Sequence, residues 1–372
     1  MALRLEAASG ALPSLPSAGL SAPRPSARKV RVGFAFDARA SASAVVAGLL
    51  LRRRSKVLRR AQAQDEGLQK LDSLLQRILQ AELSSESVTV RMEAESQATK
   101  MLSELRGGPL RFFGTAERKA AKRSYSLQEM KDNGVDATQF LNPQDSTLDF
   151  VKTVLAGVLA LGGAAFILAA KPGPGFVVFA TLVSLTILFF DQVLNKGFGE
   201  LLLLDTLGRS VSADYGQRVA CHEAGHFLVA YLLGVMPKAY TLSAWEAFSK
   251  YNSMSTQAGT VFLDEAIQRE MQSGQVSGKT LDSFVGVALG GIAAEYVTYG
   301  QANGGMSDII QLEALFDALK FDQNQTNVLL RSSVMNTVAI LREKQKAHTA
   351  LVAAMLRGDS VGRCIEVLEQ HL

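Results

Sequence analysis

Two consecutive apolar stretches limit what this chain can fold into. Thr153 to Ala170 and Phe176 to Phe190 contain no charged side chain, and the turn-forming run 171–175 separates them. A helix needs about 20 apolar residues to span a bilayer, with about 17 as the lower limit. The second stretch reaches this length only when the next few residues lie at the membrane interface. Neither stretch has the polar face that a helix of a soluble protein normally shows. We therefore predict a transmembrane hairpin over residues 150–194 rather than a hairpin buried in a soluble core.

Residues 1–60 have the composition of an organelle transit peptide. They contain twelve lysines and arginines but two acidic residues, Glu6 and Asp37, and are otherwise rich in alanine, serine, proline and glycine. This bias is typical of targeting segments, which are disordered before removal. The alternative is a basic tail that binds anionic lipid or RNA. Because the net charge of +4 comes largely from this segment, we predict no nucleic-acid partner. The Met-Ala start and the Ala/Ser bias favour a plastid over a mitochondrion.

The charges around the hairpin predict its orientation. Basic residues precede the first stretch, Lys196 and Arg209 follow the second, and the loop between them contains a single lysine, Lys171. By the positive-inside rule both ends stay on the side of import. We therefore predict a thylakoid or inner-envelope protein whose C-terminal domain faces the stroma. The mitochondrial inner membrane is the alternative.

The rest of the chain is predicted to be mainly α-helical. Apolar residues at helical spacing, such as Leu68, Leu71 and Leu75, indicate an amphipathic helical segment over residues 61–109 that lies on a neighbour or a membrane. Residues 110–149 are polar and are interpreted as a linker. Residues 212–372 form a helical domain, with predicted helices at Gln217–Leu233, Leu281–Thr298 and Asp308–Leu319 and short strands at Lys238–Ser243 and Gly259–Leu263.

The run His222-Glu223-Ala224-Gly225-His226 predicts a zinc site. Residues four apart lie on one face of a helix, so both imidazoles can bind one ion. Glu223 lies beside them and can take a proton from a water molecule whose pKa the metal lowers. Gly225 keeps the helix surface low where another helix approaches. The pattern also occurs by chance, but the apolar flanks and the total of four histidines favour a metal site.

The third ligand is not determined by spacing. A histidine six residues after His226 would mark another metalloprotease class, but that position is Leu232. His348 and His371 are interpreted as surface residues, and Cys221 as a core residue. Two carboxylates remain. Asp308 opens a predicted helix and could be a cap, and Glu295 could instead orient a ligand.

Three stretches resemble the peptidase domain of the FtsH family of membrane zinc proteases. They are residues 218–226, 289–295 and 305–309, and they cover the domain at 212–372. The resemblance implies a mostly helical zinc-peptidase fold, with Asp308 as the third ligand and Glu295 in support. The family's ATPase module is missing, because about 20 residues separate membrane and peptidase. The Gly-rich run 274–280 is one residue short of a phosphate-binding loop. The chain resembles a plastid FtsH-like protein without its motor.

These features predict an ATP-independent, membrane-anchored zinc endopeptidase that cuts membrane or stromal polypeptides. The alternative is a non-motor regulatory or assembly subunit that joins ATPase-bearing FtsH-type subunits in plastid membrane biogenesis. The chain could also form a homo-oligomer. An intramembrane protease of the site-2 type is disfavoured, because the apolar residues after His226 end near Met236, too early for a span.

Overall fold

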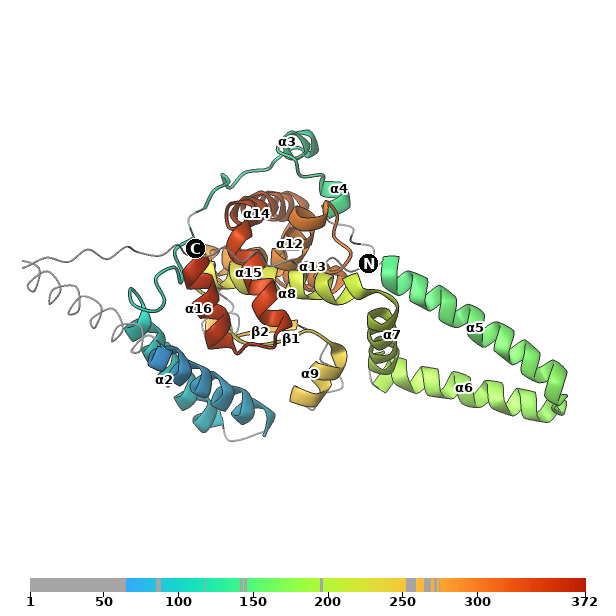
Figure 1. The fold of residues 1–372 in the computed structure, drawn as a ribbon. Helices are drawn as coiled ribbons and strands as arrows, with labels where there is room; N and C mark the ends of the chain where they lie inside the picture. Colours follow the sequence, from blue (N-terminus) through green and yellow to red (C-terminus); the bar gives the residue numbers. More distant parts are fainter. Residues whose placement is uncertain are drawn as a thin grey trace, which may run out of the picture. The chain divides into compact units, whose positions relative to one another are not determined.

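The computed structural model describes residues 65–84, 88–116, 118–140, 143, 146–194, 197–251, 259–263, 269–270, 273 and 275–372 (Figure 1). The predicted transit peptide lies outside these residues. After a helix over residues 65–83, the helices and strands are α2 (Val88–Leu105), α3 (Leu127–Asp132), α4 (Ala137–Phe140), α5 (Ser146–Ala170), α6 (Pro174–Leu194), α7 (Phe198–Val211), α8 (Ala213–Leu233), β1 (Met236–Thr241), α9 (Ala244–Tyr251), β2 (Gly259–Leu263), α11 (Gly278–Ala288), α12 (Gly290–Tyr299), α13 (Met306–Ala318), α14 (Gln323–Glu343), α15 (Gln345–Leu356) and α16 (Val361–His371). The chain is mainly helical, as predicted.

Helix α8 is the centre of the C-terminal domain. Its side chains are buried without interruption from Ala220 to Leu232, and α12, α14 and α15 pack around it (Figure 1). Helix α11 also packs against it. The polar residues of the metal motif therefore lie in an otherwise apolar helix. The helix ends at Gly234, whose φ of 84° is the left-handed conformation that glycine adopts most readily.

The strands β1 and β2 form a two-stranded antiparallel sheet beside α8. Met236 pairs with Leu263 and Thr241 pairs with Gly259. The predicted bounds of β2 are confirmed, and β1 both begins and ends two residues earlier than predicted. The predicted helix Leu281–Thr298 is wrong as a single element, because α11 and α12 meet at Leu289 with a bend of 43°.

The segment before the hairpin packs against the C-terminal domain. Leu68, Leu71 and Leu75 of the first helix join its apolar core. Residues 110–149, for which the sequence indicated a linker, contain α3 and α4, and the following side chains of this segment are buried in the same core: Leu110, Phe113, Ala120, Tyr125, Met130, Val135, Ala137 and Phe140. These apolar side chains are separated by polar residues without a regular period, so the sequence did not reveal that they are buried. Residues 110–140 are thus packed onto the domain through their apolar side chains.

Helices α5 and α6 are long and apolar enough to cross a membrane, which confirms the predicted pair of apolar helices. Their candidate spans are Leu148–Ala170 and Pro174–Leu194, and no residue of the apolar 18-residue stretch within either span is buried by the rest of the chain. The bent pair α11 and α12 passes the same test of length and composition if taken as one span. Its apolar side chains, however, lie in the core around α8.

Helix α7 joins the hairpin to the domain at a fixed corner. Asp191, near the end of α6, accepts hydrogen bonds from the backbone N–H groups of Gly199 and Glu200 at 2.9 and 3.1 Å. It thereby satisfies donors that a helix N-terminus leaves unpaired. Lys152 of α5 forms an ion pair with Glu200 at 3.2 Å. The first turn of α7 is thus tied to both apolar helices.

Candidate metal centre

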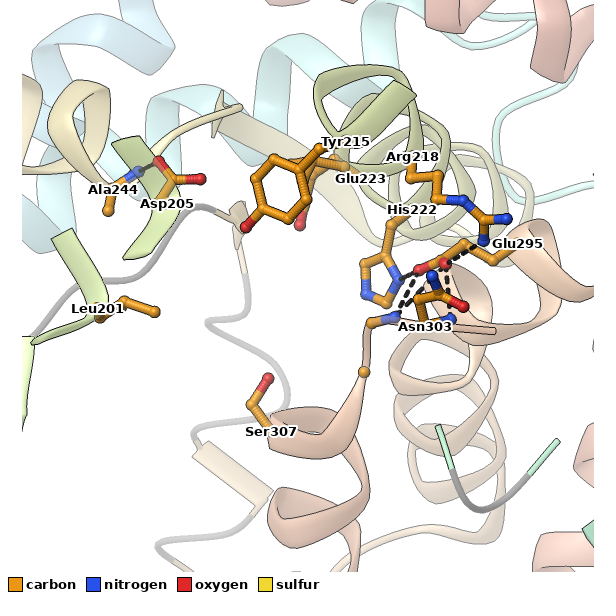
Figure 2. A pocket seen from close by; sticks show the side chains of 13 residues that line it. Leu201, Asp205, Tyr215, Arg218, His222, Glu223, Ala244, Glu295, Asn303 and Ser307 are labelled. Carbon is orange, nitrogen blue, oxygen red and sulfur yellow. Dashed lines mark hydrogen bonds and ion pairs between the residues drawn. The ribbon is translucent and has the colours of Figure 1, made fainter. Parts of the chain in front are cut away.

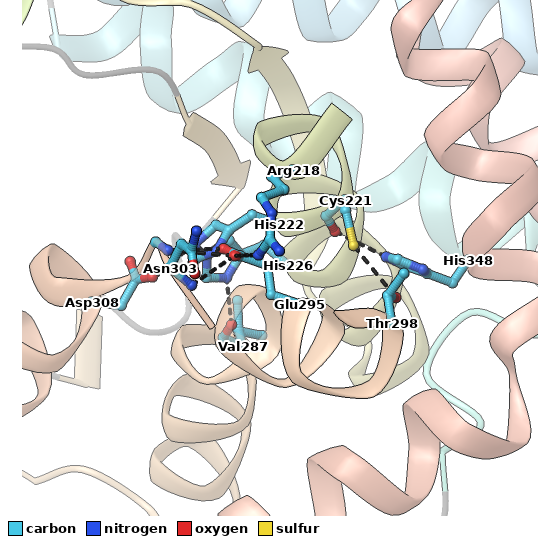
Figure 3. Close-up of polar contacts among 11 residues, drawn as sticks. Arg218, Cys221, His222, His226, Val287, Glu295, Thr298, Asn303, Asp308 and His348 are labelled. Carbon is cyan, nitrogen blue, oxygen red and sulfur yellow. Dashed lines mark hydrogen bonds and ion pairs between the residues drawn. The ribbon is translucent and has the colours of Figure 1, made fainter. Parts of the chain in front are cut away.

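Three side chains from two helices converge on one point (Figure 3). His222 and His226 come from successive turns of α8, and Asp308 comes from the first turn of α13. The two Nε2 atoms are 3.0 Å apart, and Oδ2 of Asp308 lies 3.0 Å from Nε2 of His222 and 3.3 Å from Nε2 of His226. The structure thus brings together the three predicted ligands.

The other ring nitrogen of each histidine is already engaged. Nδ1 of His226 donates a hydrogen bond to the backbone carbonyl of Val287 at 2.7 Å. Nδ1 of His222 lies 2.7 Å from Oε1 of Glu295 and donates to this carboxylate. These bonds leave both Nε2 atoms directed at Asp308, in the tautomer that a metal ion requires.

Glu295 supports His222 rather than joining the cluster. Its buried carboxylate also accepts hydrogen bonds from the backbone N–H groups of Asn303 and Gly304, at 2.9 and 3.2 Å. Arg218 lies 3.7 Å from the same carboxylate and stacks on the ring of Tyr299. The spacing of the sequence left Glu295 and Asp308 as alternatives, and the geometry gives them different positions, with Asp308 at Nε2 and Glu295 at Nδ1.

The dimensions of the cluster fit a metal ion. Tetrahedral zinc with bonds of about 2.0–2.1 Å holds its donor atoms about 3.3 Å apart, close to the three distances between the donor atoms of the cluster. His222, His226 and Asp308 therefore form a group that could hold a metal ion. Burial lowers the pKa of His222, but the hydrogen bonds to Asp308 and Glu295 outweigh it and raise that pKa well above its ordinary value. The cluster thus strongly favours bound positive charge, which a proton or a metal ion can supply.

Glu223 borders a cavity beside the cluster (Figure 2). The cavity has a volume of about 160 Å³ and is lined by Leu201 and Asp205 of α7, by His222 and Glu223, and by the loop that precedes α13. The hydroxyl of Thr260 in β2 donates a hydrogen bond of 2.9 Å to Oε2 of Glu223. The predicted base is therefore held at the wall of a cavity that also reaches His222.

Two glycines make this arrangement possible. A Cβ atom on Gly225 would lie 2.4 Å from the carbonyl oxygen of Gly290, so glycine is needed where α8 and α12 touch. A Cβ atom on Gly291 would lie 2.3 Å from Nε2 of His222. The predicted low surface at Gly225 is confirmed, and Gly291 gives the imidazole of His222 its space.

The prediction of a surface position for His348 is wrong. His348 is 4% exposed, and its Nε2 donates to the backbone carbonyl of Cys221 at 2.9 Å (Figure 3). Cys221 is buried, as predicted, whereas His371 is exposed. His348 therefore holds α8 in place next to the metal motif. Helical periodicity in α15 could not predict this bond, because the acceptor is a backbone oxygen 127 residues away.

This buried imidazole predicts a pH-dependent stability. Burial lowers the pKa of His348 despite its bond to Cys221. In the unfolded chain the histidine has its ordinary pKa of about 6.5 and therefore binds a proton more readily than in the folded chain. The contribution of neutral His348 to the free energy of unfolding is thus present above that pH and is lost as the pH falls below it. The thermal unfolding midpoint of the metal-free protein should fall between pH 7 and pH 5. We expect this fall to be smaller in the His348→Gln variant than in the wild-type protein. His371→Gln is the matched control, and an equal pH slope in the His348→Gln and wild-type proteins would contradict the prediction.

Three functional contacts have no strong signal in the sequence. Thr260 follows Glu223 by 37 residues, and Val287 contributes only its backbone. Arg218 lies one helical turn before His222, so its place on the same face could have been noticed. No protein-family model, curated protein or solved structure matches this chain. Function is therefore inferred from the side chains themselves.

Proposed function

We propose that this chain is a membrane-anchored, zinc-dependent peptide hydrolase of the FtsH-like type that acts without an ATPase module of its own. One observation carries the proposal. Two imidazole Nε2 atoms and one carboxylate oxygen meet at the spacing of zinc ligands, while both Nδ1 atoms are held by other partners. Two histidines and one carboxylate are a ligand set that catalytic zinc sites use, and it leaves a fourth position open.

The surrounding residues can perform the remaining steps of hydrolysis. Bound zinc would polarise a water molecule and lower its pKa to about 7. Glu223 would receive the proton and pass it to the amine that leaves. The hydroxyl of Thr260 holds the Glu223 carboxylate at the cavity, and Glu295 keeps the ring of His222 in its ligand orientation.

The place of the cavity supports polypeptides at a membrane surface as substrates. Leu201 and Asp205 line it, and both belong to α7, the helix that directly follows the hairpin. The proposed setting is a plastid membrane with the domain in the stroma, and the mitochondrial inner membrane is the alternative. An assembly role beside ATPase-bearing subunits would leave zinc bound without hydrolysis.

Metal content separates the roles of the two carboxylates. We expect the purified full chain to hold one equivalent of zinc and to cleave casein in a chelator-sensitive way. Asp308→Ala removes a ligand and should abolish stoichiometric zinc binding, whereas Glu295→Ala should weaken it by about 10–100-fold, as loss of a supporting partner does. The measurement is elemental analysis after dialysis, followed by competition with a chromogenic chelator. Loss of zinc in the Glu295 variant alone would overturn the ligand assignment, and chelator-insensitive cleavage would overturn the function.

A further inference from the structure

Trp245, the single tryptophan of the sequence, is exposed on α9. Its side chain is 61% exposed, although tryptophan is largely buried in most proteins. Its ring contacts that of Phe248 at 6.0 Å between centroids, and Phe248 in turn contacts Phe198 at 5.8 Å. Phe198 is the first residue of α7. The three rings thus form an aromatic row that leads from the start of α7 to the surface.

Helix α9 is firmly attached to α7. The backbone N–H of Ala244, at the start of α9, donates to Oδ2 of Asp205 at 3.0 Å. Arg209 pairs with Asp205 at 3.2 Å and also donates to the backbone carbonyl of Leu242. Because these bonds come from the buried side of α7, the position of Trp245 follows that of α7.

The start of α7 lies close to the end of the apolar helix α6. Leu194 ends α6 and Phe198 begins α7, so four Cα steps separate them, or at most about 14 Å. The bonds from Asp191 and the ion pair with Lys152 hold this turn against both helices of the hairpin. If the hairpin spans a bilayer, the aromatic row begins at the interface. Tryptophan is enriched there because its ring is apolar and its N–H can bind water or headgroups.

The charged neighbours of the row are paired with one another. Glu246 and Lys250 form an ion pair of 2.6 Å on α9, and Asp205 and Arg209 form the pair on α7. The described residues of α7 and α9 therefore give this surface no large excess of either sign, which suits an uncharged or zwitterionic lipid surface.

We infer that Trp245, backed by Phe248 and Phe198, inserts into the interfacial layer of the membrane that holds the hairpin. This contact docks the metal-binding domain on the bilayer. It requires an embedded hairpin but neither zinc nor hydrolysis, so the Glu223→Gln variant should dock equally well.

The single tryptophan allows a direct test on the full chain in phosphatidylcholine vesicles. Lipids brominated near the headgroup should quench the emission of Trp245 more than lipids brominated near the acyl-chain end. The emission of Trp245 in the full chain should also lie at shorter wavelength than the emission of a tryptophan that is fully exposed to water.

Two variants make the outcomes distinct. In a Trp245→Phe background, Phe179→Trp places the probe on α6 and should be quenched most by deep bromines. Gln370→Trp, at the exposed end of α16, should be quenched by neither, because α16 packs on α15 and β1 rather than α7. Quenching of the α6 probe without quenching of Trp245 would overturn the docking while keeping the anchor. A blue shift of the Trp245 emission without quenching would indicate contact with a second copy of the chain. An unquenched α6 probe would show that the hairpin is not embedded in the bilayer. Either result overturns the inference.

Discussion

Glu223→Gln is expected to lower hydrolysis by about 10²–10⁴-fold, the contribution typical of a general base. Glutamine keeps the size of the side chain and can still hydrogen-bond to Thr260, but its amide cannot take a proton at neutral pH. The ligands are unchanged, so zinc should stay bound at the wild-type stoichiometry. The measurement is the rate of casein cleavage at saturating zinc, with metal content determined on the same sample.

Glu366→Gln is the matched control, because it makes the same chemical change on α16, where Glu366 interacts with Arg363 and Gln370. It should cleave at the wild-type rate. Equal rates for the Glu223→Gln and wild-type proteins would remove Glu223 from the mechanism. Zinc bound in both proteins with no cleavage by either would favour the non-motor assembly role.

Gly291→Ala is expected to disrupt the metal site although it adds only one methyl group. The added Cβ would lie 2.3–2.5 Å from three atoms of the His222 ring, so the ring or α12 has to move. Forced overpacking of this kind costs about 1–3 kcal/mol. Displacement of His222 would also break its bonds to both Asp308 and Glu295. We expect zinc affinity, measured by chelator competition, to fall by at least about tenfold, since a change of about 1.4 kcal/mol corresponds to that factor.

Gly278→Ala is the matched control for this substitution. Gly278 lies in the first turn of α11, where an added methyl group would meet no atom within 4 Å, and alanine favours a helix over glycine by about 1 kcal/mol. That variant should bind zinc normally and unfold at the same or a slightly higher temperature. Normal zinc affinity in Gly291→Ala would mean that His222 does not occupy the described position when the metal is bound.

The sequence was most informative where one element acts alone. The position of α8 and its buried face were predicted from the spacing of His222 and His226 and from the apolar residues beside them. Both features depend only on helical periodicity. The same periodicity failed at Leu289, since apolar residues continue through Gly290 and Gly291 while the backbone bends there. It also failed for His348, whose burial depends on a carbonyl of another helix.

The third ligand shows the limit most clearly. The carboxylates of Glu295 and Asp308 both contact the ring of His222, at 2.7 and 3.0 Å. Their positions in the sequence and their residue types therefore did not show which of them is the candidate metal ligand. What separates them is the ring nitrogen that each one meets, and this depends on how α12 and α13 pack against α8. Tertiary packing of this kind leaves no periodic trace in a sequence.

The tight connection between α6 and α7 keeps the cavity close to the end of the apolar helix α6. Leu201, which lines the cavity, follows Phe198 by three residues, or about 4.5 Å of helix. Together with the stretch after Leu194, this places the cavity wall within about 20 Å of the end of the apolar helix. An extended strand rises about 3.3 Å per residue, so roughly six residues of a chain leaving the bilayer would cover that distance. If α5 and α6 span a bilayer and the proposed hydrolysis takes place in this cavity, a free tail of about six residues would be long enough to reach it, whereas a loop that returns to the bilayer would need about twice that length.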